Sequence, residues 1–278
     1  MGSGIYSYTT ASLRAEKSRS FTSTLSVSEA REATFKHRSL DSEMDIKGKI
    51  RESRDSEEHP NSFPIIIALD VTGSMRGIPM DLIQNSFPEI MKSLLDSGVN
   101  DAQVCFIGVG DCYCDNAPIQ CGQFESSDEL MEKWLQKVYL EGGGGANPGE
   151  SYNLAWYFAS RHTETDSFEK RGKKGVLITL GDEPCLSEIP KSEIENLFGD
   201  NAQDGITSKS LVEEVKGKWN IYHIHCEGSQ SYTLEETNWK ELIDYRVVKS
   251  EDRKADDISE IIPQLVITSY NSENVTTD

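Results

Sequence analysis

Three side chains that carry oxygen atoms stand at alternate positions in the segment 70–74. They are Asp70, Thr72 and Ser74, and Gly73 gives the backbone between them the freedom to turn sharply. One carboxylate and two hydroxyls are hard oxygen donors, which suit Mg²⁺ and also Mn²⁺. A plain strand-to-helix turn is the simpler alternative, but a helix cap uses only one of the three side chains. The segment therefore predicts a divalent-cation site.

Two more aspartates follow apolar segments like the one before Asp70. Residues 65–69, 103–109 and 174–180 are largely apolar, and Asp70, Asp111 and Asp182 follow them. Such runs are typical of strands buried on both faces of a parallel sheet, where ligands bind at the carboxyl ends of the strands. We therefore expect the three carboxylates to lie at one edge of a sheet.

Strand and helix patterns alternate from residue 65 to the end of the chain. This order predicts an α/β fold with a doubly wound, mostly parallel, Rossmann-like central sheet and helices on both faces. Further strands are expected at 219–225 and 245–248, with a short edge strand at 119–121. Helices are expected at 77–98, with a kink at Pro88, and at 127–139, with Ser127 as the cap. Further helices are expected around Ala155, after a cap at Thr207, at 235–243 and from residue 255 onward.

Charge is distributed unevenly along the 278 residues. The formal net charge is −19, yet residues 1–60 hold ten basic and ten acidic residues, so the acidic excess lies in 61–278. The first 38 residues contain six basic and three acidic residues. The charge argues against a nucleic-acid binder, because phosphate binding needs a positive field. We divide the chain into a polar, partly ordered arm with at most short local structure (1–60), a single domain (61–270) and a flexible C-terminal tail (271–278).

The first residues show neither a charged nor an apolar leader region, and no apolar run approaches the roughly 20 residues of a membrane span. These features predict a cytoplasmic protein that contacts no membrane. The six cysteines are then expected to be reduced.

The segment Asp70-Val-Thr-Gly-Ser resembles the first metal-binding loop of von Willebrand factor A-type (vWA) domains, whose usual form is Asp-x-Ser-x-Ser. The strand that ends in Asp182 resembles the third loop of that family, although Gly181-Asp182-Glu183 replaces the more usual Thr-Asp-Gly. The second loop of the family normally reads Gly-Gly-Thr, about five residues before a helical Ala. Counting back from Ala155 leads to Glu150, with no Thr in the preceding glycine run.

The resemblance implies a metal-ion-dependent adhesion site that consists of Asp70, Thr72, Ser74, Glu150 and Asp182. Glu150 departs from the family because it adds a carboxylate where a neutral Thr is usual. It could bind the metal directly or through water, or it could simply be an acid in the first turn of a helix. The expected ion is Mg²⁺, with Mn²⁺ as a second fit.

In this family an Asp or Glu of a partner protein completes the metal shell. The resemblance therefore implies a metal-dependent protein–protein interaction module with no catalytic residues. The arrangement is similar to uncharacterised intracellular bacterial vWA proteins. Similar bacterial vWA proteins often work beside AAA+ ATPases of the MoxR type or beside kinases, so the resemblance implies such a system as partner.

Two other functions are compatible with the same residues. Asp70-Val-Thr also resembles Mg²⁺-dependent phosphatases of the haloacid-dehalogenase type, but these need a second Asp where Thr72 stands, as general acid. A structural scaffold with a vestigial metal site is the other alternative.

The cysteines and histidines raise the question of zinc. Candidate ligands are Cys112, Cys114 and Cys121, completed by His223 or His225, but no pair of cysteines has the Cys-x-x-Cys spacing. We expect reduced loop cysteines and a core or rim pair of histidines instead. Asp111 and Asp115 are expected to share a rim loop, and Glu183 and Pro184 to shape the turn after Asp182.

Overall fold

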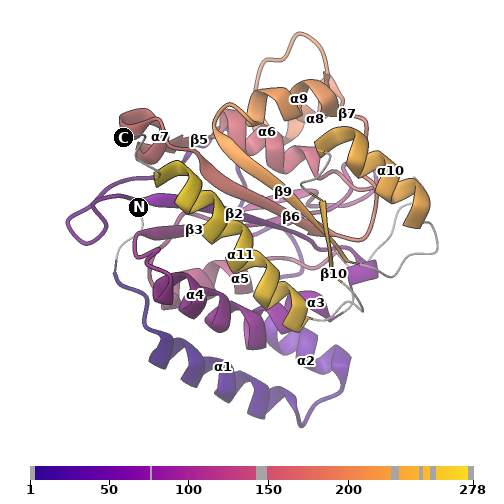
Figure 1. Ribbon diagram of the computed structural model, residues 1–278. Coiled ribbons are helices and arrows are strands. Elements are labelled where there is room, and N and C mark those ends of the chain that lie inside the picture. The colour runs from indigo at the N-terminus through magenta and orange to yellow at the C-terminus, as the bar shows by residue number, and fades with distance from the viewer. Residues whose placement is uncertain are drawn as a thin grey trace.

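The computed structural model describes residues 4–75, 77–141, 149–226, 232–243, 247–250 and 255–274. Its centre is a six-stranded sheet in which every neighbouring pair is parallel except the last. Helices cover both faces (Figure 1), which confirms the predicted α/β class and the mostly parallel, doubly wound sheet. In spatial order the strands are β10 (Val247–Ser250), β9 (Trp219–Cys226), β6 (Gly175–Gly181), β2 (Phe63–Asp70), β3 (Ala102–Val109) and the antiparallel β4 (Ile119–Cys121).

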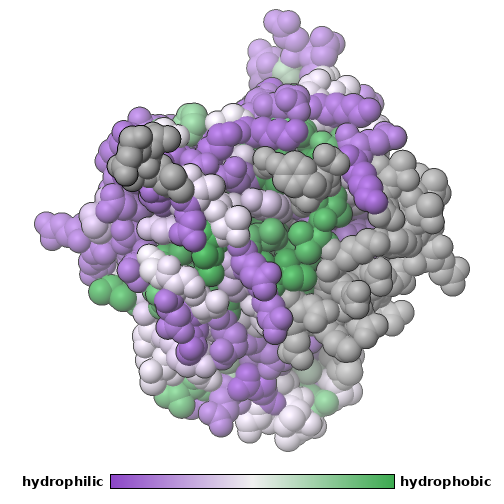
Figure 2. Space-filling view, in the orientation of Figure 1, coloured by the Kyte–Doolittle hydropathy of each residue, from purple (hydrophilic) through white to green (hydrophobic). Residues whose placement is uncertain are grey.

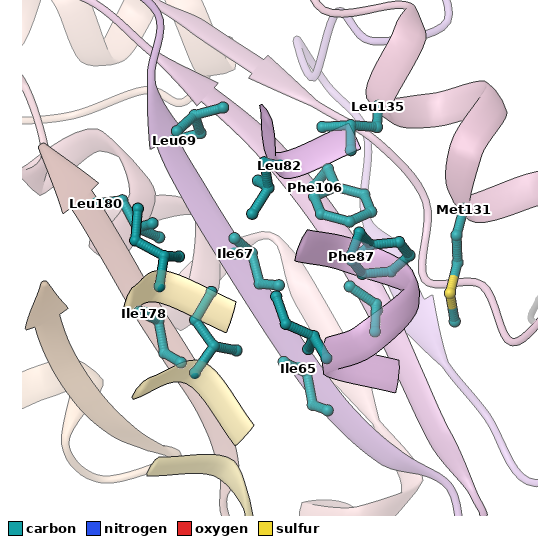
Figure 3. Packing of buried hydrophobic residues seen from close by; sticks show 14 of the residues in the cluster. Ile65, Ile67, Leu69, Leu82, Phe87, Phe106, Met131, Leu135, Ile178 and Leu180 are labelled. Atoms are coloured by element: carbon teal, nitrogen blue, oxygen red, sulfur yellow. The ribbon is translucent and has the colours of Figure 1, made fainter. Parts of the chain in front are cut away.

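Strand β2 lies inside the sheet and is buried along its whole length. Ile65 and Ile67 belong to the apolar cluster on one face, and Ile66 belongs to the cluster on the other. A strand covered on both sides has no polar face, which explains its continuous apolar sequence. Figure 3 shows the first cluster, in which Leu82 and Phe87 pack beside the strand.

The helices divide between the two faces. Helices α4, α5 and α11 supply side chains to the cluster that contains Ile65, and α6, α9 and α10 supply the cluster that contains Ile66. Ser127 and Thr207 cap α5 and α9, as predicted: each side-chain oxygen accepts a backbone N–H three residues ahead. The bounds are α4 (Phe87–Asp96), α5 (Asp128–Gln136), α6 (Asn153–Arg161), α9 (Ser208–Val215), α10 (Tyr232–Ile243) and α11 (Ala255–Asn274).

The predicted helix over residues 77–98 is interrupted earlier than expected. Helix α3 (Ile78–Asp81) runs into a π-helical turn, η2 (Leu82–Ser86), before α4 begins. The Phe87 N–H donates to the Leu82 carbonyl, five residues back. Pro88 then lies in the first turn of α4, where its missing N–H is tolerated. The irregularity is therefore a π turn ahead of Pro88 rather than a kink at it.

The first 60 residues form more regular structure than the sequence indicated. Tyr6, Ala11 and Met44 are buried in the same cluster as Ile65. The expectation of at most short local structure is wrong for α1, whose small Ala residues and ion pairs make the contact without a strong apolar stripe. The proposed domain boundary at residue 61 stays a prediction. The elements are α1 (Tyr8–Thr22), α2 (Val27–Thr34) and β1 (Arg51–Ser53), which pairs in parallel with β5 (Thr163–Thr165).

Helix α11 extends into the predicted tail. It is helical to Asn274 and so includes residues 271–274 of that segment, while residues 275–278 lie outside the described part of the chain. Glu273 anchors this end because its carboxylate accepts the Lys174 N–H at 3.0 Å. Figure 2, in the orientation of Figure 1, shows hydrophilic side chains over much of the face that is turned to the viewer. The remaining elements are η1 (Gly73–Met75), α7 (Asp166–Arg171), β7 (Glu188–Ile189), α8 (Lys191–Glu193), η3 (Ile194–Phe198) and β8 (Ile206–Thr207).

None of the helices in the described residues combines the length and the apolar character that crossing a membrane requires. The six cysteines are free thiols.

Candidate metal centre

Asp70 and Asp182 meet at the carboxyl ends of two neighbouring parallel strands. Asp70 is the last residue of β2, and Asp182 follows β6 directly. The Ser74 hydroxyl donates to Asp182 Oδ1 at 2.7 Å, and its oxygen also lies next to the hydroxyl of Thr72, which donates to Asp70. Both carboxylates are buried. The side chains thus come together at the strand ends, where the sequence analysis expected them.

The first loop orders its oxygen atoms through short local hydrogen bonds. The backbone N–H and the hydroxyl of Thr72 donate to Asp70 Oδ1 at 2.8 and 2.6 Å. The Thr72 and Ser74 hydroxyl oxygens lie 3.1 Å apart. Asp70, Thr72, Ser74 and Asp182 therefore form one continuous chain of oxygen atoms, which comprises four of the five residues that the sequence proposed.

Tyr152 is a further residue of the centre that the sequence analysis missed. It precedes α6 and is fully buried, and its hydroxyl donates to Asp70 Oδ2 at 2.7 Å. Thr72 therefore holds one oxygen of Asp70 and Tyr152 holds the other. This fixes the orientation of the carboxylate.

Gly181 makes room for Tyr152. A Cβ atom at position 181 would lie 1.7 Å from the Tyr152 hydroxyl oxygen and 2.4 Å from the ring carbon that bears it. Any larger residue would displace the ring. Gly at position 181, where the family usually has Thr, was thus the sequence feature that indicated a large side chain packed against this position. The sequence did not identify that side chain as Tyr152.

Glu150 lies beside this chain of oxygen atoms without joining it. Its backbone is held between Pro184 and Leu186, through bonds of 2.9 and 3.0 Å. Its side chain is 5 % exposed, and Oε2 has no hydrogen-bond partner. Among the described residues, no group of three or more His, Cys, Asp or Glu side chains is placed to hold a metal ion. Glu150 is therefore a buried carboxyl group next to the centre whose Oε2 has no partner.

Negative charge accumulates at this edge of the sheet. Burial raises the pKa of Asp70 to about 6 against the hydrogen bonds from Thr72 and Tyr152, and the charge of Asp182 adds to the rise. Burial also raises the pKa of Glu150 to about 10, with the charges of Asp70 and Asp111 adding to it. The strongest charges acting on Glu150 are thus those of other carboxylates.

The rim loop after β3 uses its carboxylates to hold its own backbone. Asp111 Oδ1 accepts the Tyr113 N–H at 2.9 Å, and Asp115 Oδ2 accepts the Asp111 N–H at 2.7 Å. The Cys114 thiol donates to Asp111 Oδ2 at 3.1 Å. These contacts give Asp111 and Asp115 a role in shaping the loop beside the centre.

The turn after Asp182 is held by its backbone carbonyls. The Glu183 carbonyl accepts the Trp239 indole N–H at 3.0 Å, and the Pro184 carbonyl accepts the Glu150 N–H. This agrees with the expectation that Glu183 and Pro184 shape the turn.

The residues considered for zinc are not assembled into a site. Cys121 is buried on β4, whereas Cys114 is exposed in the rim loop. His223 is buried on β9 and stacks on Trp239 with ring centroids 3.5 Å apart, and it lies 3.4 Å from His225. The histidines therefore form the expected core pair. The absence of a metal cluster among the described residues includes these side chains.

The donor set of the centre suits a small, hard divalent cation. It offers two carboxylates and two hydroxyls, and Mg²⁺ commonly binds few protein oxygens because it retains several water molecules. The unpartnered Oε2 of Glu150 is a buried polar atom that a metal-bound water would satisfy. Asp70, Thr72, Ser74 and Asp182 are the residues that would hold the ion.

Solved structures with a similar fold include two pilus proteins. The pilus adhesin SpaC from Lactobacillus rhamnosus GG, in its open conformation, matches 82 % of this chain and 31 % of its own at 11 % identity, with a TM-score of 0.54. The vWF domain of the type V pili tip protein Mfa5 from Porphyromonas gingivalis matches 78 % of this chain and 98 % of its own at 8 % identity, with a TM-score of 0.50. This chain thus spans 31 % of the length of SpaC.

A third similar structure is the proximal thread matrix protein 1 of the mussel byssus, with a zinc-occupied MIDAS motif. It matches 81 % of this chain and 47 % of its own at 12 % identity. Its TM-score is 0.47. No protein-family model matches the sequence, and neither does any curated protein.

Identities this low show the fold alone. The parallel sheet, the helices on both faces and the similarity to SpaC and to the Mfa5 domain agree with the resemblance of the first loop. This chain therefore folds as a von Willebrand factor A-type domain.

Proposed function

We propose that this chain is a protein-interaction module that depends on a divalent cation. Asp70, Thr72, Ser74 and Asp182 hold Mg²⁺, and Mn²⁺ can replace it. The observation that carries the proposal is the continuous chain of oxygen atoms from Asp70 through Thr72 and Ser74 to Asp182. When bound, the cation would supply a coordination position for the carboxylate of a partner protein.

Glu150 acts on the cation through water rather than as a direct ligand. Its Oε2 is buried and without a partner, yet Glu150 stands outside any three-carboxylate group in the described residues. An acid that accepts a hydrogen bond from a metal-bound water orients that water. It also leaves the ion with less negative charge from the protein, so that the ion can still attract an external carboxylate.

A binding role suits the surroundings of the centre better than catalysis. The position two residues after Asp70, where a phosphatase would need a general acid, is a Thr whose hydroxyl donates to Asp70 itself. SpaC is a pilus adhesin and Mfa5 is a type V pili tip protein, so two proteins that share this fold are pilus proteins. These features support a module that binds a partner.

Calorimetric titration of the full chain with MgCl₂ and with MnCl₂ tests the cation site. We expect the wild type to bind, and both Asp70→Ala and Asp182→Ala to lose binding. Asp204→Ala is the matched control, because Asp204 is exposed and lies in the loop before β8. Circular dichroism checks that each variant is folded. A wild type that does not bind would favour the vestigial scaffold, and an equal loss in Asp204→Ala would remove the assignment.

Affinity capture with and without chelator tests the partner. The proteins to identify are those that the wild type retains in Mg²⁺, releases in EDTA, and does not retain when Asp70 is replaced by Ala. The AAA+ ATPase or kinase partner that the sequence resemblance implies remains a prediction for this experiment. Hydrolysis of p-nitrophenyl phosphate that requires Mg²⁺ and is lost in Asp70→Asn would overturn the interaction role in favour of a phosphatase.

A further inference from the structure

Helix α1 of the arm packs against α4 and against the π turn η2 that precedes it (Figure 1). This turn is a break in the helix that follows the first metal loop. Pro88 has no N–H, and in a regular α-helix its ring would clash with the carbonyl of Gln84, four residues back. The Gln84 carbonyl therefore lacks the donor that an uninterrupted helix would supply. Such breaks are the points at which helices bend.

Arg19 of α1 supplies the missing donor. Its guanidinium donates to the Gln84 carbonyl at 2.7 Å and to Asn85 Oδ1 at 3.1 Å. Gln84 is buried, and its side-chain amide donates in turn to two hydroxyl groups of α1 at 3.0 and 3.2 Å. The break is therefore bonded to α1 through its backbone and through its side chains.

The contacts of α1 reach both sides of the break. On the side of α3, Asn85 Nδ2 donates to Asp81 Oδ1 at 2.5 Å, so that Asn85 connects Arg19 to α3. On the side of α4, the Tyr8 hydroxyl donates to Glu89 Oε1 at 2.6 Å. Helix α1 thus bridges the break and holds the angle between α3 and α4.

The segment before the break leads directly to the first metal loop. The turn η1, which contains Ser74, ends at Met75, and α3 begins at Ile78. Met75, Ile78 and Phe87 are buried in the same apolar cluster as Ala11 of α1. Because these side chains pack together, a change of angle at the break would displace Ser74 from the chain of oxygen atoms.

Helix α1 is attached mainly through polar contacts. Its buried side chains are Ala11 and Ala15, which are small, whereas Leu13 and Phe21 are 52 and 61 % exposed. Two buried methyl groups contribute far less stability than large apolar side chains do. Helix α1 therefore detaches at a lower free-energy cost than the helices that cover the sheet.

We infer that helix α1 docks reversibly across the break and that its docking favours cation binding at the first metal loop. The inference rests on the proposed function, because it concerns the same cation. Arg19 is a positioning residue that acts through Gln84 and Asn85. Linkage between two sites is reciprocal, so a bound cation stabilises the docking of α1 by the same factor. The arm is then a regulatory element of the metal centre.

The test combines two measurements on the full chain. Calorimetric titration with MgCl₂ gives the cation affinity, and hydrogen exchange read by mass spectrometry gives the docking of α1. Arg19→Ala removes both bonds to the break, whereas Arg19→Lys keeps a cationic donor. Lys17→Ala is the matched control, because Lys17 is exposed on the same helix and its removal changes the net charge equally. Circular dichroism checks that each variant is folded.

We expect Arg19→Ala to bind Mg²⁺ about fivefold more weakly, at the lower end of typical couplings between sites, and the other two variants to stay within about twofold of the wild type. In the wild type, saturating Mg²⁺ should slow the exchange of residues 8–22 by a factor of the same order and leave α9 unchanged. Without Mg²⁺, Arg19→Ala should speed the exchange of residues 8–22 and 78–90.

Equal Mg²⁺ affinities for the wild type and Arg19→Ala would overturn the inference and leave the proposed function intact. So would an exchange rate of residues 8–22 that Mg²⁺ does not change, because a purely structural contact predicts that result. An equal loss in Lys17→Ala would assign the effect to net charge and overturn the role of Arg19. A wild type that binds neither Mg²⁺ nor Mn²⁺ would overturn the proposed function, and the linkage with it.

Discussion

Asp70 and Asp166 are both buried carboxylates, but opposite charges lie beside them. Arg54 belongs to the arm, and its guanidinium donates to Asp166 and Glu169 of helix α7 at 3.1 and 2.6 Å. Asp166 is 4 % exposed and also accepts from Lys170 and from the Asp55 N–H. Here the chain supplies the cations that its own carboxylates need. We call this group the Arg54 network.

The pKa values reflect this difference. Burial opposes the ionisation of Asp166, yet the hydrogen bonds from Lys170, the Asp55 N–H and Arg54 outweigh it and lower its pKa to about 2. Burial raises the pKa of Asp70 to about 6, and the charge of Asp182 raises it further. Asp166 thus receives cationic partners from the chain, whereas Asp70 receives hydrogen bonds from the neutral groups of Thr72 and Tyr152, as the proposed cation site would require.

Removing the central cation of the Arg54 network should have the largest effect. Arg54→Leu is expected to lower the free energy of unfolding by about 3 kcal/mol, because it leaves the buried Asp166 without a main counter-ion. Urea unfolding at neutral pH measures this. Lys92→Leu is the control: its pair with Asp96 is exposed, and we expect a much smaller loss than for Arg54→Leu. A loss below about 1 kcal/mol for Arg54→Leu would mean that Lys170 alone suffices as the counter-ion of Asp166.

Gly181→Ala tests the packing behind the metal centre. The added methyl group overlaps the Tyr152 hydroxyl, so we expect a loss of about 2 to 3 kcal/mol in the free energy of unfolding. The double variant Gly181→Ala/Tyr152→Ala should lose less than the sum of the two single variants, because the overlap is then gone. Additive losses would contradict the contact.

Acid should weaken the Arg54 network. The pKa of Asp166 is about 2 in the folded protein and about 3.9 in an unfolded chain, so its ionised form adds stability that is fully present above pH ~4. This contribution, about 2 kcal/mol, is lost as the pH falls through the folded pKa. The difference in unfolding free energy between wild type and Asp166→Asn should therefore shrink between pH ~5 and ~2. A constant difference over that range would contradict the lowered pKa.

Tyr152→Phe should have the smallest effect on folding and a clear effect on cation binding. It keeps the ring that packs over Gly181 but removes the donor to Asp70 Oδ2. We expect Mg²⁺ to bind about tenfold more weakly, since a residue that orients a metal ligand commonly affects affinity by that factor. Calorimetric titration measures this, with Tyr157→Phe as the control, because the Tyr157 hydroxyl donates to Asp200 instead. Equal affinities for wild type and Tyr152→Phe would show that Thr72 alone orients Asp70.

The sequence was most informative where the evidence is local. The apolar run of β2 predicted a buried strand, and the pattern of donors two residues apart predicted the loop in which Thr72 bonds to Asp70. Helix caps at Ser127 and Thr207 were predicted for the same reason, since each uses an N–H three residues ahead. The parallel order of the strands then placed Asp70 and Asp182 at one edge.

The sequence was least informative for helix α1. Its contacts use Ala11, Ala15 and the ion pairs of Arg14, which leave no broad apolar stripe along the helix. Composition alone therefore indicated an arm with little structure. The π turn before Pro88 was also hidden, because a break in the hydrogen-bond pattern leaves the spacing of apolar residues nearly unchanged.

The sequence by itself determined the fold class and the first loop, because burial patterns and short-range hydrogen bonds depend on residues that are close along the chain. Only the tertiary structure brought Tyr152 to Asp70, which lie 82 positions apart, and explained Gly181 by the ring that packs against it. Such contacts depend on how distant segments pack, and the spacing of residues along one sequence contains no direct measure of that distance.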